Sequence, residues 1–362
     1  MATKFNTELK ELIQRTTVTV PDEAENMLTK IGNSAFSNCT SLTSIDLPNV
    51  TSIGINAFSN CTSLTSINLP NVTSIDKGAF NYCTSLTSID LPNVTSIGGY
   101  AFWDCIITIT LAGYTDSFSS GYFINNASNV HLILPNVTSI GDSAFRNCTS
   151  LTFIDLPNVT SIDNNAFDSC TSLTSIDLPN VTSIGNYAFN GCSKLSSITN
   201  LDNVTSIGSS AFRNCTSLTS IDLPNVTSIG SSAFYDCTSL TSIDLPKVTS
   251  IGINAFFGCT SLTSIDLPNV TSIDTYAFNS CTSLTFIDLP NVTSIGNGAF
   301  YNCTSLTSID LPNVTSIGYN AFYGCSKLTA IHFSAANKST IEALSDYSSK
   351  WGATNATIYF DL

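Results

Sequence analysis

Residues 39–60 read CTSLTSIDLPNVTSIGINAFSN, and near-copies of this stretch fill most of a chain of 362 residues. The 13 cysteines mark the period, because successive ones stand 22 residues apart with two exceptions. One step is 23 residues, and a step of 43 conceals a divergent repeat in which Asn126 takes the cysteine position. A fixed period of this length is typical of a solenoid, which grows as one continuous core instead of dividing into domains.

Each unit contains one short strand and one return segment. Leu42-x-x-Ile45-x-Leu47 has strand spacing, with Ile45 and Leu47 on the inward face. Pro48 ends the strand because proline has no amide hydrogen to donate to a neighbouring strand. Phe58 lies on the inward side of the return segment, which we expect to be a short helical turn. One unit cannot bury its own apolar face, so the copies must stack.

The stacked units predict an α/β solenoid of about 14 repeats of 22 residues, with one parallel β-sheet and capped ends. Val18 begins a candidate further strand before the first full repeat. Caps are expected because a solenoid otherwise exposes its core at both ends. The predicted division is a helical cap at 1–17, the solenoid at 18–333 with a divergent repeat near 106–135, and a helix-strand cap at 334–362.

The unit LTSIDLPNVTSIGxxAFxxCTS closely resembles the BspA-like (Treponema pallidum type) leucine-rich repeats over nearly the whole chain between the caps. The resemblance implies a right-handed leucine-rich repeat solenoid with a binding role. Members of that family are mostly surface or secreted proteins implicated in adhesion, so it also implies a cell-surface or secreted location. The resemblance does not identify a ligand, and the family's repeat has no catalytic residues that could be assigned to this chain. One departure is Val50, which stands where leucine-rich repeats often have asparagine.

The composition restricts the classes of partner. Charged residues are 10% of the chain and the formal net charge is −14, so the surface repels phosphate backbones and argues against nucleic acid and anionic membranes. No apolar run is long enough to span a bilayer. The N-terminal stretch lacks the apolar core of a signal peptide, which leaves cytoplasmic and virion locations open beside the cell surface.

The column of cysteines has two interpretations. It is either a metal chain or disulfide ladder, or a column of small polarizable core residues with free thiols. No Cys-x-x-Cys spacing occurs and no histidine repeats beside the cysteines. We therefore expect buried free thiols, with no metal and no cofactor.

A column of aspartates is predicted on the outward face of the strands. Like charges about 5 Å apart repel by on the order of 1 kcal/mol in water, so hydroxyl hydrogen bonds or cations must offset them. The column suggests a calcium ladder as one hypothesis, but one carboxylate per turn supplies few ligands, which favours a solvated polar face. Its uninterrupted part comprises Asp222, Asp244, Asp266, Asp288 and Asp310.

The divergent middle interrupts this polar face with apolar residues. They are predicted to form an outward patch on the strands, and exposed apolar clusters often mark contact sites. The alternative is that the insertion at 112–121 folds over them. The residues of this predicted strand-face patch are Ile107, Val130, His131, Ile133 and Phe153.

Variation among the repeats concentrates in the two residues on either side of Ala-Phe. These positions hold Tyr, Asn, Ser and Gly with some Trp, Phe and Arg, a mixture that binding loops favour. Relaxed constraint at exposed sites is the alternative, although drift would enrich Lys and Glu, which are rare here. The predicted ligand-binding residues are Tyr100, Trp103, Tyr235, Phe257, Tyr276, Tyr301, Tyr319 and Tyr323.

No motif in the sequence supports catalysis. The two histidines, His131 and His332, stand far apart without a nucleophile and carboxylate at motif spacing. The leading hypothesis is a non-enzymatic, adhesin-like protein that binds a protein or a glycan. The alternative is a structural role as a surface-coat, virion or self-assembling spacer element, and self-association therefore stays open.

Overall fold

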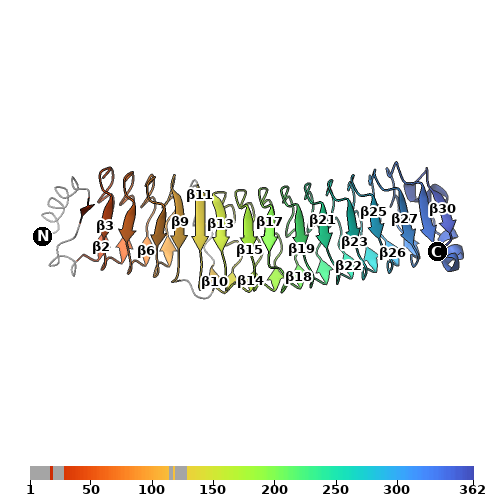
Figure 1. Ribbon diagram of the computed structural model, residues 1–362, viewed down its shortest axis with the longest axis horizontal. Coiled ribbons are helices and arrows are strands. Elements are labelled where there is room, and N and C mark those ends of the chain that lie inside the picture. The colour runs from red at the N-terminus through yellow and green to blue at the C-terminus, as the bar shows by residue number, and fades with distance from the viewer. Residues whose placement is uncertain (1–16, 19–27, 114–116, 119–128) are drawn as a thin grey trace. The chain divides into compact units, whose positions relative to one another are not determined.

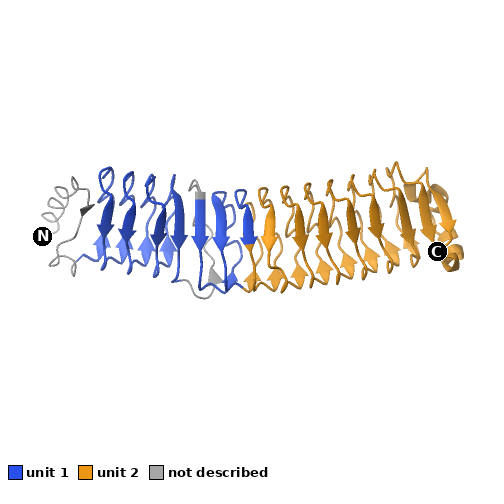
Figure 2. Cartoon of the chain, in the orientation of Figure 1, with its two compact units in different colours: residues 1–159, 170–176 blue, residues 160–169, 177–362 orange. Residues whose placement is uncertain are grey.

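The computed structural model describes residues 17–18, 28–113, 117–118 and 129–362 (Figure 1). The predicted N-terminal helix lies outside these ranges. The chain forms two compact units, coloured separately in Figure 2. Unit 1 comprises residues 1–159 and 170–176, and unit 2 comprises residues 160–169 and 177–362.

Unit 1 is a stack of turns with two columns of parallel strands. The register is strict, since Ser44 pairs with Ser66 and Ile45 with Ile67 one turn later. The first column comprises β1 (Thr17–Val18), β3 (Ser44–Asp46), β5 (Ser66–Asn68), β7 (Ser88–Asp90), β9 (Ile106–Thr110), β11 (Asn129–Ile133) and β13 (Leu151–Asp155). The second comprises β2 (Lys30–Ile31), β4 (Ser52–Ile53), β6 (Ser74–Ile75), β8 (Ser96–Ile97), β10 (Ser117–Phe118) and β12 (Ser139–Ile140).

Unit 2 repeats both columns. The first comprises β17 (Ser197–Thr199), β19 (Ser220–Asp222), β21 (Ser242–Asp244), β23 (Ser264–Asp266), β25 (Phe286–Asp288), β27 (Ser308–Leu311), β29 (Ala330–Phe333) and β30 (Thr357–Phe360). The second comprises β14 (Ser161–Ile162), β16 (Ser183–Ile184), β18 (Ser206–Ile207), β20 (Ser228–Ile229), β22 (Ser250–Ile251), β24 (Ser272–Ile273), β26 (Ser294–Ile295) and β28 (Ser316–Ile317). The strand β15 (Ser175–Asp177) contains residues of both units.

The return segment differs from the short helical turn that we expected. It is a two-residue strand followed by consecutive β-turns, in which amides alternate between a local and a neighbouring acceptor. Ala57 N donates to Gly54 O at 3.2 Å within the turn, whereas Phe58 N donates to Ala79 O at 2.7 Å in the next turn. A helix would direct every amide back along its own chain. About every second amide of the return segment therefore bonds to the neighbouring turn instead of to its own turn.

The core is a ladder of identical side chains. In unit 2 the ring of Phe234 stacks between Phe212 and Phe256, with both pairs of centroids 5.3 Å apart, and Phe234 is fully buried. Each such aromatic pair adds roughly 0.5–1.5 kcal/mol to the gain from burial. The predicted fold class is confirmed, as a parallel solenoid of about 13 turns of roughly 22 residues.

The C-terminal segment of unit 2 packs against the last turn. It contains η1 (Ala335–Asn337), α3 (Lys338–Glu342) and η2 (Tyr347–Gly352), followed by β30, which pairs in parallel with β29. Trp351 is fully buried there, and its backbone carbonyl accepts a hydrogen bond from Phe322 N at 3.0 Å. Its ring lies against Phe333, with the centroids 5.9 Å apart. This indole thus covers apolar side chains that a further turn would otherwise bury.

Candidate binding surfaces

The turns around Ala-Phe require a left-handed backbone at two positions. In the repeat that contains Phe58, the residues are Asn56 and Asn60, with φ of 53° and 60°. Asn, Asp and Gly adopt this conformation at the smallest cost. The abundance of Asn and Gly at these two positions therefore has a backbone cause, and the aromatic residues remain as a sign of recognition.

Four tyrosines occupy the same left-handed positions. Their φ values are 59° for Tyr82, 61° for Tyr100, 56° for Tyr187 and 55° for Tyr276. A bulky side chain in this region costs on the order of 1 kcal/mol, and such strain collects at functional sites. All four rings are exposed. Tyr82 and Tyr187 were absent from the residues that we predicted, because their backbone conformation cannot be read from one repeat.

Unit 2 carries most of the predicted aromatic residues on its turns. The rings of Tyr235 and Phe257 stack with centroids 4.6 Å apart and planes 2° apart, and the guanidinium of Arg213 lies 4.7 Å from the Tyr235 centroid. Tyr301 and Tyr323 form a second stack at 5.0 Å. Tyr276 and Tyr319 join these four aromatic residues on the turns of unit 2, and none of the six is buried. We call this set the aromatic strip: Tyr235, Phe257, Tyr276, Tyr301, Tyr319 and Tyr323.

Unit 1 brings Tyr100 and Trp103 together. Trp103 N donates to Tyr100 O at 3.1 Å, and this turn places the two ring centroids 5.0 Å apart at an interplanar angle of 39°. Tyr82 comes beside them because its amide donates to Trp103 O at 2.8 Å. The three rings line a surface hollow, which we call the aromatic hollow: Asn56, Lys77, Gly78, Asn81, Tyr82, Tyr100 and Trp103.

The predicted strand-face patch is wrong in two of its five residues. Ile107 and Val130 are 2% and 0% exposed. The strands β9 and β11 have five residues instead of three, so the alternation of inward side chains extends to earlier positions and turns these two into the core. The sequence pattern of the regular repeat did not reveal this extension.

The rest of the strand-face patch lies at the surface of unit 1. His131, Ile133 and Phe153 are half-buried, and the His131 and Phe153 rings meet edge-on with centroids 4.4 Å apart. Ile106, which we did not predict, is 63% exposed. Of the insertion, Ser117 and Phe118 form β10 in the second strand column, and most of its other residues lie outside the described ranges.

The aspartate column is exposed on the strands, as predicted. In unit 2 Asp244 stands in register between Asp222 and Asp266, and Asp266 pairs with Asp288. Asp310 stands beside His332, whose Nδ1 lies 2.8 Å from Asp361 Oδ1. Among the described residues, no three or more His, Cys, Asp or Glu side chains are grouped so as to hold a metal ion.

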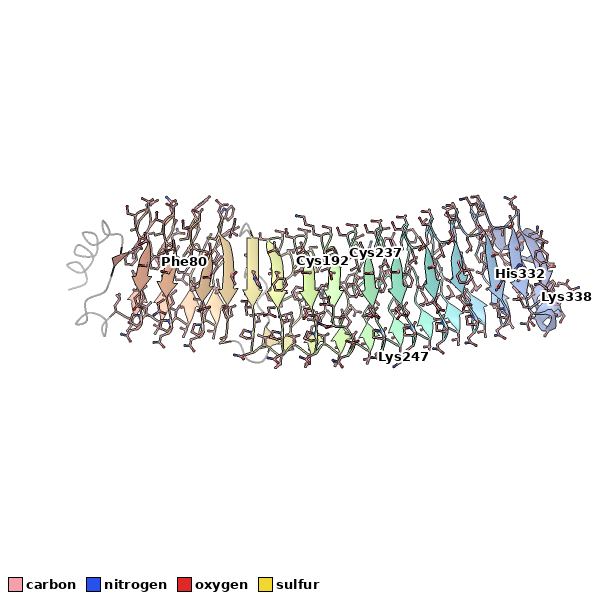
Figure 3. The ribbon with its side chains drawn as sticks, viewed as in Figure 1. Phe80, Cys192, Cys237, Lys247, His332 and Lys338 are labelled. Carbon is pink, nitrogen blue, oxygen red and sulfur yellow. The ribbon has the colours of Figure 1, made fainter. Side chains whose placement is uncertain are left out.

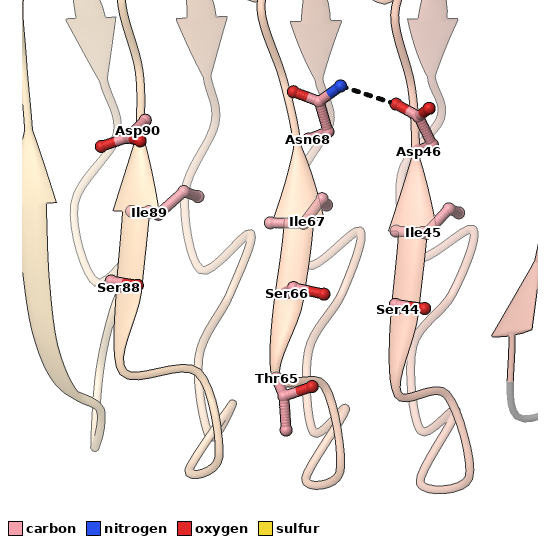
Figure 4. Close-up of a pocket in the computed structure, with 10 residues that line it drawn as sticks. All are labelled: Ser44, Ile45, Asp46, Thr65, Ser66, Ile67, Asn68, Ser88, Ile89 and Asp90. Carbon is pink, nitrogen blue, oxygen red and sulfur yellow. Dashed lines mark hydrogen bonds between the residues drawn. The ribbon is translucent and has the colours of Figure 1, made fainter.

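In unit 1 an amide interrupts the column. Asn68 Nδ2 donates to Asp46 Oδ1 at 2.8 Å across neighbouring strands (Figure 4). Asp46, Asn68 and Asp90 line a shallow groove on this face, together with serines and isoleucines of the same strands. An amide between two carboxylates replaces one repulsion with a hydrogen bond, which is one way in which the polar face is stabilised.

The cysteines are free and buried, as we expected, and their thiols have a specific role. Cys61 Sγ donates to Phe36 O at 3.1 Å, and Cys192 and Cys237, labelled in Figure 3, bond to Phe167 and Phe212 in the same way. Burial raises the pKa of Cys83 to about 12. The Cys83 thiol is therefore a protonated donor inside the core, bonded to Phe58 O at 3.1 Å, a role that spacing alone did not predict.

A parallel solenoid with leucines at fixed positions beside the strands and turns of about 22 residues defines the leucine-rich repeat proteins, which are scaffolds for protein interaction. The chain belongs to the family with the BspA type leucine rich repeat region, whose model of six repeat copies matches residues 14–130, 116–241 and 227–349. No curated protein matches the chain. No helix among the described residues has the length and apolarity to cross a membrane.

Solved structures of bacterial leucine-rich repeat proteins resemble the chain. A leucine-rich repeat protein from Bacteroides ovatus is 30% identical with a TM-score of 0.60, over 92% of this chain and 88% of that one. A leucine rich cell surface protein from Faecalibacterium prausnitzii is 32% identical with a TM-score of 0.42, over 84% and 83%. The leucine-rich repeat protein of T. pallidum is 26% identical with a TM-score of 0.39, over 64% and 86%.

Proposed function

We propose that the chain is a non-enzymatic, adhesin-like binding protein of the cell surface or the secreted fraction. Its ligand is a protein or a glycan, and the aromatic strip of unit 2 makes the principal contact. The observation that carries this proposal is the pair of stacked aromatic couples, Tyr235 with Phe257 and Tyr301 with Tyr323, on the surface of the turns. The location rests on the resemblance to the family alone.

The physical argument concerns area and entropy. Aromatic rings give a large contact area and have few rotamers to lose on binding. Stacking holds each ring against its neighbour before a ligand arrives, so less conformational freedom is lost in the complex. Tyr276 and Tyr319 extend the strip with 42% and 64% exposed side chains. A surface of this kind favours a role in recognition over relaxed constraint at exposed positions.

The exposed part of the strand-face patch is a second contact in this proposal. Ile106, His131, Ile133 and Phe153 place apolar atoms on the first strand column of unit 1. The neighbouring regular strands hold serine, threonine and aspartate at the outward positions. An apolar cluster surrounded by polar residues favours a contact with a partner.

A self-assembling structural role is the second candidate, and β30 is the observation that favours it. This strand pairs with β29 and with no other strand among the described residues. An unpaired strand edge is a template for another chain. Sedimentation velocity at increasing concentration tests this role, since ordered multimers support it and a monomer at all concentrations contradicts it.

The experiment on the aromatic strip uses a variant in which its six residues are replaced by serine. Binding is measured by biolayer interferometry against purified extracellular-matrix proteins, mucins and a glycan array. We expect the unaltered chain to bind at least one probe and the variant to bind it about tenfold more weakly or worse, with an unchanged circular dichroism spectrum. The matched control replaces the exposed Ile55 and Ile253 by serine. Equal binding by the strip variant would contradict the proposal.

A further inference from the structure

We propose that the aromatic hollow of unit 1 is a binding site for a neutral oligosaccharide of pyranose sugars. The inference rests on the proposed binding function and assigns a ligand class to a site separate from the aromatic strip. It depends on three features of the hollow, namely its rings, its amides and the position of its one lysine.

The rings form an open, angled platform. The side chains of Tyr82, Tyr100 and Trp103 are 43%, 40% and 37% exposed, and the Tyr100 and Trp103 planes differ by 39°. The C–H faces of a pyranose are apolar and flat, so they can stack on such rings, whose π faces are electron-rich. Two rings at an angle can contact successive sugar units of a chain that twists.

The amides supply hydrogen-bonding groups for sugar hydroxyls. Asn56 and Asn81 line the hollow, and Asn81 Oδ1 is a buried acceptor without a hydrogen-bond partner in the described structure. A buried acceptor that stays unpaired costs about 1–3 kcal/mol. A sugar hydroxyl recovers that cost if the covered Asn81 amide turns its oxygen toward the hollow, whereas an aliphatic ligand offers no donor.

The backbone of the hollow is left-handed at several of its lining residues. Gly78 is one of them, with φ of 67°. Tyr82 and Tyr100 adopt the same conformation at the cost described above, at positions where other turns place asparagine or glycine. No other adjacent pair of described turns combines a tryptophan with two left-handed tyrosines.

The charge distribution disfavours two other classes of ligand that aromatic rings bind. Lys77 Nζ lies 5.5 Å from the centroid of the Tyr100 ring, so an ammonium already occupies the neighbourhood of that π face. A quaternary ammonium ligand would meet like charge there, although three rings otherwise suit such cations. Single-stranded nucleic acid also stacks on aromatic rings, but its phosphates are repelled by a chain of net charge −14.

The two tryptophans make the site directly observable. Trp103 is exposed in the hollow, whereas Trp351 is fully buried in the C-terminal segment. Iodide therefore quenches the fluorescence of Trp103 selectively, and a sugar that stacks on Trp103 protects it. The probes are cellohexaose, maltohexaose, chitohexaose, mannohexaose and xylohexaose, with phosphocholine and oligothymidine as the competing ligand classes. Isothermal titration calorimetry with each protecting probe gives the affinity.

The variants are chosen to preserve the fold. Tyr100→Asn introduces the residue that other turns hold at this position and retains Trp103 as the reporter. Trp103→Ser removes the second ring. Because it also removes the fluorescent reporter, its binding is measured by calorimetry. The matched control is Tyr187→Asn, which makes the same change at an exposed, left-handed tyrosine in unit 2.

We expect at least one hexasaccharide to protect Trp103, and Tyr100→Asn and Trp103→Ser to weaken its binding about tenfold or more, with Tyr187→Asn unchanged. The inference is overturned if no hexasaccharide protects Trp103, if only phosphocholine or oligothymidine does, or if the control weakens binding equally. Failure here is distinguishable from failure of the proposed function. If only the inference about the hollow fails, the aromatic strip still binds a probe. If the proposed function fails, binding that depends on the strip is absent.

Discussion

Cys237 Sγ donates a hydrogen bond to the backbone carbonyl of Phe212, 3.1 Å away in the preceding turn. The same carbonyl accepts the amide of Cys215 from its own turn, also at 3.1 Å. One carbonyl oxygen thus joins a bond that closes a turn to a bond that connects two turns. Because this arrangement recurs along both units, the cysteine column stabilises the stacking of the turns as well as filling the core.

Replacing Cys237 by alanine should lower the free energy of unfolding by about 1–3 kcal/mol. The change removes one hydrogen bond to the Phe212 carbonyl and leaves a small cavity beside it. Urea unfolding followed by circular dichroism measures the loss. Cys237→Ser is the matched control, since its hydroxyl retains a donor at the same position. If alanine and serine destabilise the chain equally, the thiol contributes packing alone.

The stability of the chain should decrease as the pH rises above about 9. Burial raises the pKa of the Cys83 and Cys105 thiols from an ordinary value of 9.0 to about 12. Between these values the unfolded chain loses thiol protons that the folded chain retains, so deprotonation favours unfolding. The stabilisation is complete below pH 9 and is lost as the pH approaches 12.

Thermal unfolding between pH 7 and 11 measures this dependence. A double variant, Cys83→Val with Cys105→Val, lacks two of the titrating groups and should show a shallower decrease than the unaltered chain. In the folded chain the buried thiols should also resist Ellman's reagent at pH 8 and react only in denaturant. Rapid reaction of the folded chain, or a midpoint that does not change with pH, would show that the thiols are accessible.

Replacing Tyr276 by asparagine should stabilise the chain and weaken binding by the aromatic strip. Asparagine adopts a positive φ more readily than tyrosine, so the change should raise the free energy of unfolding by roughly 0.5–1 kcal/mol. Urea unfolding and interferometry are measured on the same preparation. Tyr319→Asn is the control, because Tyr319 is exposed without a left-handed backbone and its replacement should leave stability unchanged. A destabilised Tyr276→Asn would show that this ring is a packing residue of the turn.

The sequence alone was sufficient for the period, the first strand column and the core of the regular repeats. Ile45 and Leu47 alternate with outward residues, and this alternation predicts both the strand and its buried face. Asp222 and Asp244 stand one period apart, which predicts that they share one column once the turns are parallel. These features follow from the spacing of residues within one repeat and from the need to bury its apolar side.

The tertiary structure decided what depends on the contact between turns. The left-handed backbone at Asn56, the thiol bond to a carbonyl 25 residues earlier and the burial of Ile107 all require the register of neighbouring turns. The aromatic hollow also depends on the contact between turns, since a hydrogen bond between turns brings Tyr82 beside Trp103. A repeat specifies its own inward face, whereas the surface that it presents is completed by the repeats above and below it.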